Sequence, residues 1–252
     1  PAGKFVMGSD KGQDNERPQQ TIEIPYTYKI ARYPVTNADF AKFVNATKYK
    51  TTAEEAGKSW VKGAEVKGAN WAHPSVPEST IDQIQDHPVV QVSWRDAIAY
   101  CEWLQQNLQG SKTPEGFKVR LPTEAEWEKA ARGEYGKEYP WGDEFDKTKC
   151  NTEESGIGTT TPVGKFSPQG DSPYGVADMA GNVWEWCQSK YKAYPYNAND
   201  GREKLDGDEA RVLRGVSFDL NQWGARGAFR LNLRPHYRNY GIGFRVVVSS
   251  IS

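Results

Sequence analysis

Residues 211–247 read RVLRGVSFDLNQWGARGAFRLNLRPHYRNYGIGFRVV, and this stretch decides the fold. Arginine recurs in it at every fourth position, at Arg226, Arg230, Arg234 and Arg238. Such spacing is typical of one helix face, but glycines and a proline interrupt the run too often for a helix to persist. We therefore expect turns and short strands, in which a regular arginine framework encloses irregular apolar and aromatic residues.

Upstream of this stretch, the sequence predicts strands near the beginning of the chain. Phe5, Val6 and Met7 are consecutive apolar residues, and apolar residues alternate with polar ones between positions 22 and 30. Alternation of this kind is typical of half-buried strands. The apolar residues of HPVVQV, at 87–92, predict one more strand.

Three amphipathic helices are predicted from apolar spacing and capping residues. Thr36 or the next residue can cap the first helix. The second begins after Ser93, which has an acidic residue three positions on, and ends near Gly110. The third begins after Thr123, in a second capping box, and ends at Gly133 with only one stripe expected to be buried.

Residues 46–86 form a family-specific insertion in our interpretation. They are polar, rich in lysine and without a steady period, so we expect a long surface excursion in which Trp60 and Trp71 pack back onto the body. The chain shows no internal repeat and no clear linker. We therefore expect a single domain over residues 1–252.

Composition excludes several classes of function. The net charge is −1, so no basic field points to nucleic acid or an anionic membrane as partner. No apolar run approaches the ~20 residues of a membrane span. An aromatic content of 12% with a mean hydropathy of −0.79 predicts a loop-rich globule.

Cysteine usage favours a reducing compartment. Cys101, Cys150 and Cys187 match no zinc pattern and cannot form a disulfide framework, so we expect reduced thiols, with Cys101 in the core. Together with the lack of a signal peptide, this favours the cytoplasm over the cell surface. Pro1 is an unusual start, and we expect the chain to be a domain of a longer protein.

Ordered motifs give a resemblance to a known family. PVTNADFAKFV, RLPTEAEWEKAARG, YPWGDE, DMAGNVWEWC, RVLRG and GFRVV occur here in the order that resembles the formylglycine-generating enzyme (sulfatase-modifying factor) family. The resemblance covers nearly the whole chain. It implies a variant of the C-type lectin-like fold, which is an irregular α+β fold with few helices, short twisted antiparallel strands and much coil.

The enzymatic branches of that family do not match this chain. Active oxidases carry two cysteines that bind copper(I), and the matching positions here are near Leu220 and Ala225, with no cysteine anywhere after Cys187. A second branch needs a three-histidine iron site, whereas this chain has three scattered histidines, including His73 and His87. We therefore predict no catalytic residue and keep a divergent oxidase as the alternative.

The C-terminal stretch resembles that of the variable proteins of diversity-generating retroelements. In those proteins, fixed Arg, Gly and Pro residues separate positions that are altered by adenine-directed mutagenesis. The resemblance implies a non-catalytic receptor or display protein whose variable region, residues 211–247, recognises a protein or other macromolecular ligand. The predicted contact residues are Val216, Phe218, Asp219, Leu220, Asn221, Trp223, Phe229, Leu231, Asn232, Leu233, His236, Tyr237 and Tyr240.

Residue chemistry agrees with a recognition surface. Mutagenesis at adenines alters the first two bases of the asparagine codon AAC, and such changes never produce Lys, Glu, Gln or Met. None of these four residue types occurs at the positions that resemble the altered ones in variable proteins. Aromatic residues with Asn and His are also the composition of antibody paratopes. The alternative is that Phe218, Trp223 and Phe229 belong to the core.

We expect the protein to be a monomer.

Calcium is the one metal that the resemblance implies, as a structural ion and not a required cofactor. Asn182 and Glu185 in GNVWEW are the candidate ligands, because oxygen donors suit calcium. The alternative is a buried turn in which Glu185 pairs with an arginine. A second site at Asn151 and residues 153–157 is less well matched, because Ser155 stands where a carboxylate is common.

The arginines themselves admit two interpretations. Their guanidinium groups could bind phosphate or carboxylate ligands, or they could pair with backbone carbonyls and buried acids to fix the loops. We favour the structural role.

Overall fold

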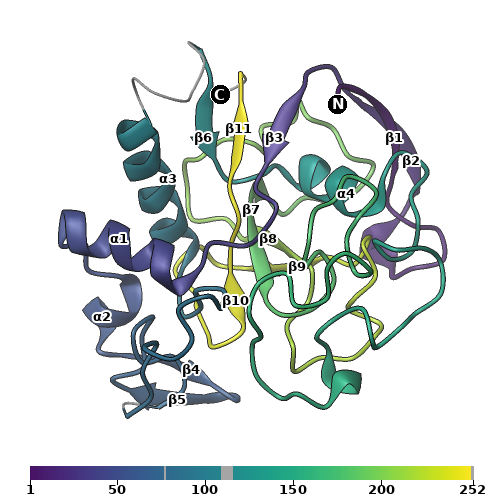
Figure 1. Ribbon diagram of the computed structural model, residues 1–252. Coiled ribbons are helices and arrows are strands. Elements are labelled where there is room, and N and C mark those ends of the chain that lie inside the picture. Colours follow the sequence, from purple (N-terminus) through teal and green to yellow (C-terminus); the bar gives the residue numbers. More distant parts are fainter. Residues whose placement is uncertain (77, 109–115, 251–252) are drawn as a thin grey trace.

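The computed structural model describes residues 1–76, 78–108 and 116–250 and shows the predicted α+β fold (Figure 1). Its helices and single-turn 3-10 helices are separated by long coil. The helices are α1 (Asn37–Thr47), α2 (Thr52–Ala56), α3 (Trp94–Leu108) and α4 (Glu124–Arg132), and the 3-10 turns are η1 (Asp14–Glu16) and η2 (Glu153–Ser155). None of the described helices is both long and apolar enough to cross a bilayer.

The strands form four small sheets. A hairpin pairs β1 (Gly3–Met7) with β2 (Gln20–Ile24), and another pairs β4 (Lys58–Val61) with β5 (Ala64–Lys67). A third sheet has the order β3 (Tyr28–Ile30), β11 (Val247–Ser249), β6 (Lys118–Arg120). The central sheet has the order β10 (Ile242–Gly243), β7 (Trp184–Lys190), β8 (Arg211–Arg214), β9 (Leu231–Leu233). The stretch 211–247 therefore consists of short strands and turns, as predicted.

The helix starts follow the predicted capping residues. Thr36 caps α1 by accepting a hydrogen bond from the Asp39 amide at 3.2 Å. Thr123 and Glu126 form the capping box of α4, whose C-cap is Gly133, with a φ of +72° that favours glycine. The predicted end of the α3 region at Gly110 lies outside the described residues.

Two predictions of local structure are wrong. Residues 87–92 form no strand, because the backbone turns at Gln91, whose φ is +62°. Residues 46–86 are not an irregular excursion, since they contain α2 and the β4–β5 hairpin. This hairpin closes at Lys62 and Gly63, which both have positive φ, as a tight two-residue hairpin turn requires.

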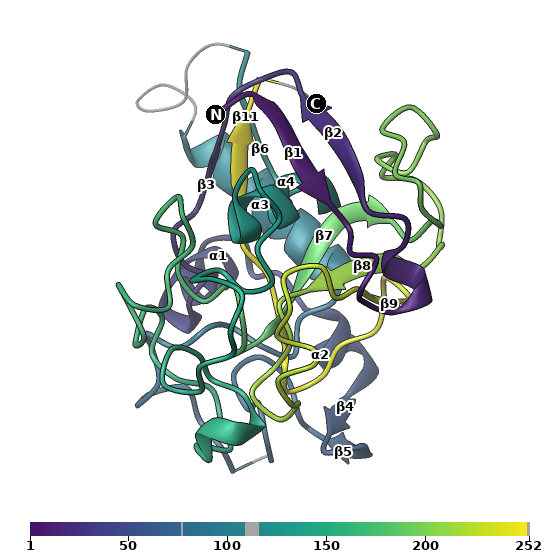
Figure 2. The ribbon, with the colours of Figure 1, turned by 90° about the vertical axis from the view of Figure 1, so that its right-hand side faces the viewer.

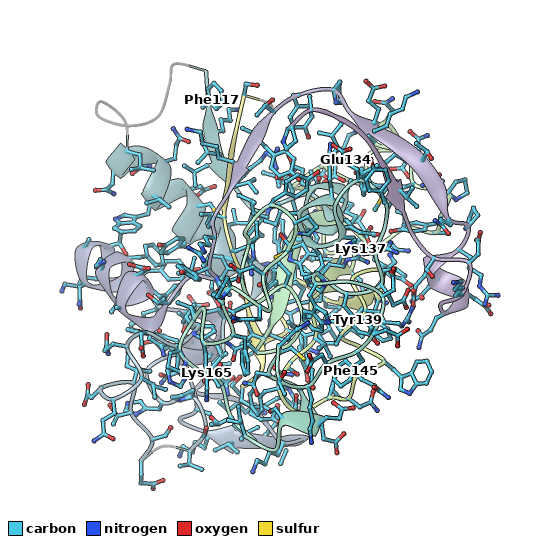
Figure 3. All side chains as sticks on the ribbon, turned by 45° about the vertical axis from the view of Figure 1, so that its right-hand side comes forward. Phe117, Glu134, Lys137, Tyr139, Phe145 and Lys165 are labelled. Atoms are coloured by element: carbon cyan, nitrogen blue, oxygen red, sulfur yellow. The ribbon has the colours of Figure 1, made fainter. Side chains whose placement is uncertain are left out.

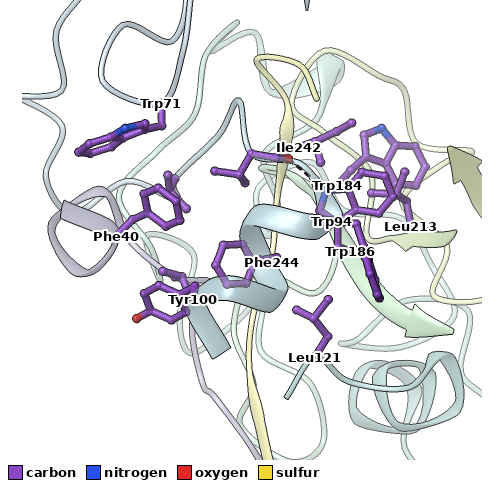
Figure 4. Close-up of a cluster of buried hydrophobic side chains, with 14 of the residues drawn as sticks. Phe40, Trp71, Trp94, Tyr100, Leu121, Trp184, Trp186, Leu213, Ile242 and Phe244 are labelled. Atoms are coloured by element: carbon purple, nitrogen blue, oxygen red, sulfur yellow. Dashed lines mark hydrogen bonds between the residues drawn. The ribbon is translucent and has the colours of Figure 1, made fainter. Parts of the chain in front are cut away.

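The main core lies where α1 and α3 face the central segments (Figure 4). Phe40 stacks on Tyr100 at 5.9 Å between ring centroids, and Phe244 contacts both rings. Trp71 is 8% exposed and packs on Phe40, as predicted for the insertion. Cys101 belongs to this core, and all three cysteines are free and buried, which confirms the prediction of reduced thiols.

Aromatic side chains also hold coil segments that lie outside the sheets. Tyr139 stacks on Trp141 at 5.5 Å and contacts Phe145 at 5.6 Å, on the face shown in Figure 3. The YPWGDE motif is therefore a packed turn.

Candidate ligand-binding surface

The arginines of the C-terminal stretch are ion-paired inside the protein. Arg226 makes a two-pronged pair with buried Glu16, with N–O distances of 2.8 and 2.6 Å. Arg214 is fully buried, pairs with Glu128 and donates to the backbone oxygen of Gly227 at 2.9 Å. These contacts tie the loops of residues 215–230 to the N-terminal segment and to α4.

Two further arginines complete the same arrangement. Arg230 pairs with Glu124 at 2.5 and 2.9 Å, and Arg245 pairs with Glu185 at 2.6 Å through both oxygens. All four side chains are buried. The structural interpretation of the arginines is therefore confirmed for Arg214, Arg226, Arg230 and Arg245, which we call the arginine framework together with their glutamate partners.

Some of the side chains between the framework residues are exposed to solvent, and others are half-buried. Trp223 is 67% exposed and Leu220 is 43% exposed, which is unusual for large apolar residues. Five predicted contact residues are exposed, namely Asp219, Leu220, Asn221, Trp223 and His236. Six are half-buried, namely Phe229, Leu231, Asn232, Leu233, Tyr237 and Tyr240. We call these eleven residues the C-terminal loop surface.

Two predicted contact residues belong to the core instead. Val216 is fully buried with φ at +61° and packs against Gly224, where an added Cβ would lie 2.6 Å from a Val216 methyl carbon. Phe218 is 4% exposed, and its ring lies edge-on to Tyr240 at 5.5 Å. Both predictions are wrong because the turn after β8 sends these side chains inward. Phe229 is intermediate, since it contacts Trp184 at 5.9 Å.

The turn η2 supports the exposed loop at 219–223, a role that the sequence did not indicate. The Glu153 amide donates to the Leu220 oxygen at 2.9 Å, and the Gln222 amide donates to the Glu154 carboxylate at 2.8 Å. Burial by itself would raise the pKa of Glu154, but hydrogen bonds from Gln222 and Thr152 lower it. Glu154 is thus held as an anion beneath the loop.

The β4–β5 hairpin supports the other exposed loop, at 236–240. The Trp60 ring stacks on Tyr237 at 6.4 Å, and the Tyr240 amide donates to the Trp60 oxygen at 3.2 Å. Buried Gln91 donates to the same Trp60 oxygen at 3.2 Å. Figure 2 shows this hairpin next to the yellow-green C-terminal loops. Sequence reasoning missed Gln91, and its only signal for Trp60 was a tryptophan in a polar insertion.

The predicted calcium ligands are engaged with protein partners. Both oxygens of Glu185 bond to Arg245, and Trp127 also donates to one of them at 2.7 Å. The Asn182 side-chain oxygen accepts from the Thr161 amide at 2.9 Å and from Asn151 at 3.2 Å. These side chains do not fit a calcium ion, since three bonds to Glu185 and two to the Asn182 oxygen already use most of their acceptor capacity. GNVWEW is instead the buried turn of the alternative interpretation.

In the second candidate calcium loop, the Asn151 side-chain oxygen accepts from the Ser155 hydroxyl at 3.1 Å, so Ser155 is an internal partner there in place of a carboxylate. Within the described residues, His, Cys, Asp and Glu side chains form no group of three or more that could hold a metal.

The two positions that match the cysteine pair of the active oxidases do not form a common site, and neither do His73 and His87. Leu220 is exposed whereas Ala225 is 1% exposed and sits in the core. His73 bonds to the Ser79 oxygen at 2.6 Å within its own loop, whereas His87 bonds to the Thr160 hydroxyl at 2.9 Å in a segment 73 positions away. Burial raises the pKa of Cys150 to about 12, so its thiol stays protonated at neutral pH.

Fold and site together define a lectin-like α+β domain that carries loops on a rigid ionic framework. Comparison with known proteins identifies the family. The sequence profile of the sulfatase-modifying factor enzyme 1-like domain matches residues 1–250. The chain therefore belongs to the formylglycine-generating enzyme (sulfatase-modifying factor) family.

The relatives in this family carry different names. Formylglycine-generating enzyme of Bos taurus is 40% identical over 97% of this chain and 72% of its own length. Inactive C-alpha-formylglycine-generating enzyme 2 of Bos taurus is 35% identical over 97% of this chain and 85% of its own length. Family membership is thus compatible both with an enzyme and with an inactive protein.

Solved structures share the fold over nearly the whole chain. PvdO from Pseudomonas aeruginosa superposes with a TM-score of 0.77 at 26% identity, covering 99% of this chain and 92% of that one. Treponema denticola variable protein 1 superposes with a TM-score of 0.68 at 22% identity, covering 98% of this chain and 94% of that one. The second likeness shows the fold alone.

Proposed function

We propose that this protein is a non-catalytic receptor or display protein that binds a macromolecular ligand, most simply a protein, through the C-terminal loop surface. The observation that carries the proposal is the separation between framework and loop. Arg214, Arg226, Arg230 and Arg245 are buried in ion pairs, while Leu220 and Trp223 project into solvent from the turns between them.

The chemistry of the loop surface suits protein recognition. Tyr, Trp and Phe supply contact area with few rotatable bonds, and Asn and His supply hydrogen bonds. Because the framework holds the backbone of this stretch, its exposed residues, such as Leu220, Trp223 and His236, can be exchanged without loss of the fold. We infer that a retroelement diversifies these positions, and the fold shared with Treponema denticola variable protein 1 supports this inference.

A nucleotide comparison tests the diversification. The proposal expects a near-copy of the codons for the C-terminal loop surface close to the gene, differing almost only at adenines and accompanied by a reverse transcriptase. The codons for the framework arginines should be identical in both copies. A gene neighbourhood without such a copy would contradict diversification, although a fixed binding protein would remain.

A divergent oxidase is the second candidate, and the 40% identity to a formylglycine-generating enzyme favours it. It would need metal ligands other than the family's cysteine pair, because no cysteine follows Cys187. The test is a formylglycine assay on a cysteine-containing peptide with added copper. Turnover that a chelator abolishes would refute the non-catalytic proposal, and the absence of turnover would support it.

A further inference from the structure

A second candidate site lies away from the C-terminal loop surface, at a cavity of about 290 Å³. Its walls come from β2 and the residues after it, β6, the start of α4, β7 and the loop 196–203. The lining includes Tyr26, Arg120, Gln188, Tyr196 and Glu203. In Figure 2, β2 and the light-green loop lie on the upper right, above β9. At roughly 30 Å³ per water molecule, the cavity has room for a ligand of on the order of ten heavy atoms.

Glu203 is half-buried and departs from a rule that the fully buried glutamates follow. Glu16, Glu124, Glu126, Glu128 and Glu185 are fully buried, and each pairs with an arginine. A buried carboxylate needs such a partner because leaving water costs it several kcal/mol.

The partners of Glu203 are both neutral. Its carboxylate accepts from the Ser189 hydroxyl at 2.7 Å and from the Tyr196 hydroxyl at 3.0 Å. Among the described residues, none places a cationic nitrogen within 4.0 Å of the Glu203 carboxylate, although Arg120 and Arg211 lie close enough to interact with it electrostatically. Arg120 lines the same cavity, but its guanidinium makes a two-pronged bond to Glu126 at 2.7 Å.

We propose that the cavity binds a small organic cation, and that an alkylammonium group of this ligand supplies the charge missing beside the Glu203 carboxylate. The Tyr26 ring lines the same space and suits a cation, since the faces of aromatic rings attract positive charge. The Tyr196 ring also lines it, with the buried Arg202 guanidinium over one of its faces at 4.3 Å from the ring centroid. Gln188 adds a polar wall for the remainder of the ligand. The ammonium group can belong to a free amine or to a lysine side chain.

Titration calorimetry with n-butylammonium tests the proposal, with 1-pentanol as the neutral ligand of similar size. The proposal expects the cation to bind and the alcohol to bind at least tenfold more weakly. Equal binding of the two, or no binding of n-butylammonium and of Nα-acetyl-lysine amide, overturns it. Binding of n-butylammonium supports a free amine, and binding of the lysine derivative alone supports a lysine side chain.

Two variants locate the ligand. Glu203→Gln keeps the shape of the side chain and should weaken binding at least tenfold. Ala198→Trp places a large ring on an exposed residue of the lining and should block the cavity without removing a charge. Undiminished binding by either folded variant overturns the proposal, and thermal unfolding of each reports whether it is folded. Glu65→Gln, on the β4–β5 hairpin, is the matched control and should bind normally.

The pH dependence gives an independent readout. Burial raises the pKa of Glu203 to about 7, and hydrogen bonds from Ser189 and Tyr196 oppose this shift. Glu124 and Glu126 on α4 raise it further, whereas Arg120 on β6 and Arg211 on β8 are the cations that interact with Glu203 electrostatically. Glu23 lines the same cavity, and Lys118 and Lys204 line a neighbouring pocket that shares Arg120 and Glu203 with it. Binding should strengthen between pH 6 and pH 8, as the carboxyl loses its proton. A flat profile over this range would contradict pairing with Glu203.

Discussion

At the scale of single residues, buried pairs of a glutamate and an arginine fix the positions of segments that are distant in sequence. Glu185 is an example. Its two oxygens accept three short hydrogen bonds, from Arg245 twice and from Trp127 once. A buried pair of this kind specifies position more than it adds stability, because desolvation offsets most of the attraction.

Removing one member of such a pair should nevertheless be costly. Glu185→Gln leaves the buried Arg245 charge without a counterion, and we expect a loss of about 3–5 kcal/mol in the free energy of unfolding. Urea denaturation measures it. The control is Glu65→Gln, which breaks the exposed pair with Lys58 and should cost at most about 1 kcal/mol. Similar losses in the two variants would show that burial does not set the cost.

The exposed loop residues should behave in the opposite way. The double variant Leu220→Ser/Trp223→Ser removes side chains that face solvent, so the free energy of unfolding should change by no more than about 1 kcal/mol. Arg226→Gln, three residues further on, should cost several times more because it leaves Glu16 unpaired. Thermal and urea unfolding of both proteins measure this difference. Broad unfolding of the loop variant would contradict the division into framework and exchangeable surface.

At the scale of elements, α4 explains how the framework is anchored. Every residue of this helix is buried, although sequence spacing predicted a single buried stripe. The reason lies in its glutamates, since Glu124, Glu126 and Glu128 face Arg230, Arg120 and Arg214 from different sides. Their partners come from distant parts of the chain, so no pattern within the helix could reveal that its polar faces are also interior.

The start of α4 offers a direct test. The Thr123 hydroxyl accepts from the Glu126 amide at 3.1 Å, so Thr123→Ala should lower the free energy of unfolding by about 1 kcal/mol through loss of the cap. Thr123→Ser keeps the hydroxyl and should retain most of the free energy of unfolding that Thr123→Ala loses. Urea midpoints of the two variants decide the matter, and equal midpoints would show that the cap contributes nothing.

The β4–β5 hairpin should control the order of the loop at 236–240. Trp60→Ala removes the ring that stacks on Tyr237, and we expect hydrogen exchange of the Tyr240 amide to accelerate about tenfold as this region opens locally. The Gly224 amide, which bonds to the Asn221 oxygen in the other loop, is the internal control. Equal acceleration at both amides would indicate global destabilisation and contradict local support.

At the scale of the whole molecule, acid should weaken the fold through the same ionic framework. Burial alone would raise the pKa of Glu128, but Arg214 and Arg132 outweigh it and lower the pKa below 4.5. A carboxyl whose folded pKa is lowered stabilises the protein above its unfolded pKa, and this contribution is lost as the pH falls through the folded value. The free energy of unfolding should therefore decrease as the pH falls below about 4.5. Denaturation curves between pH 6 and pH 3 measure it, and a constant value would contradict the prediction.

The sequence by itself determined the fold class, the starts of α1, α3 and α4, and the division of the C-terminal stretch. A capping residue such as Thr123 bonds to an amide only three positions further on, and the alternation of arginine and glycine with other residue types lies within residues 211–247. Both signals involve residues close in sequence, so they can be recognised without coordinates. The three buried, unpaired cysteines were also predictable, from their number and spacing.

Only the tertiary structure decided which residues are exposed and which charges meet. Val216 and Phe218 look like their exposed neighbours in sequence, but the turn after β8 directs them into the core. Glu185 looks like a metal ligand until Arg245, 60 positions away, occupies its oxygens. Support of the loops by Trp60 and Glu154 likewise depends on segments distant in sequence, and so does the neutral pairing of Glu203 with Ser189 and Tyr196. Burial and ion pairing are properties of the packed chain, and for this reason no local pattern specifies them.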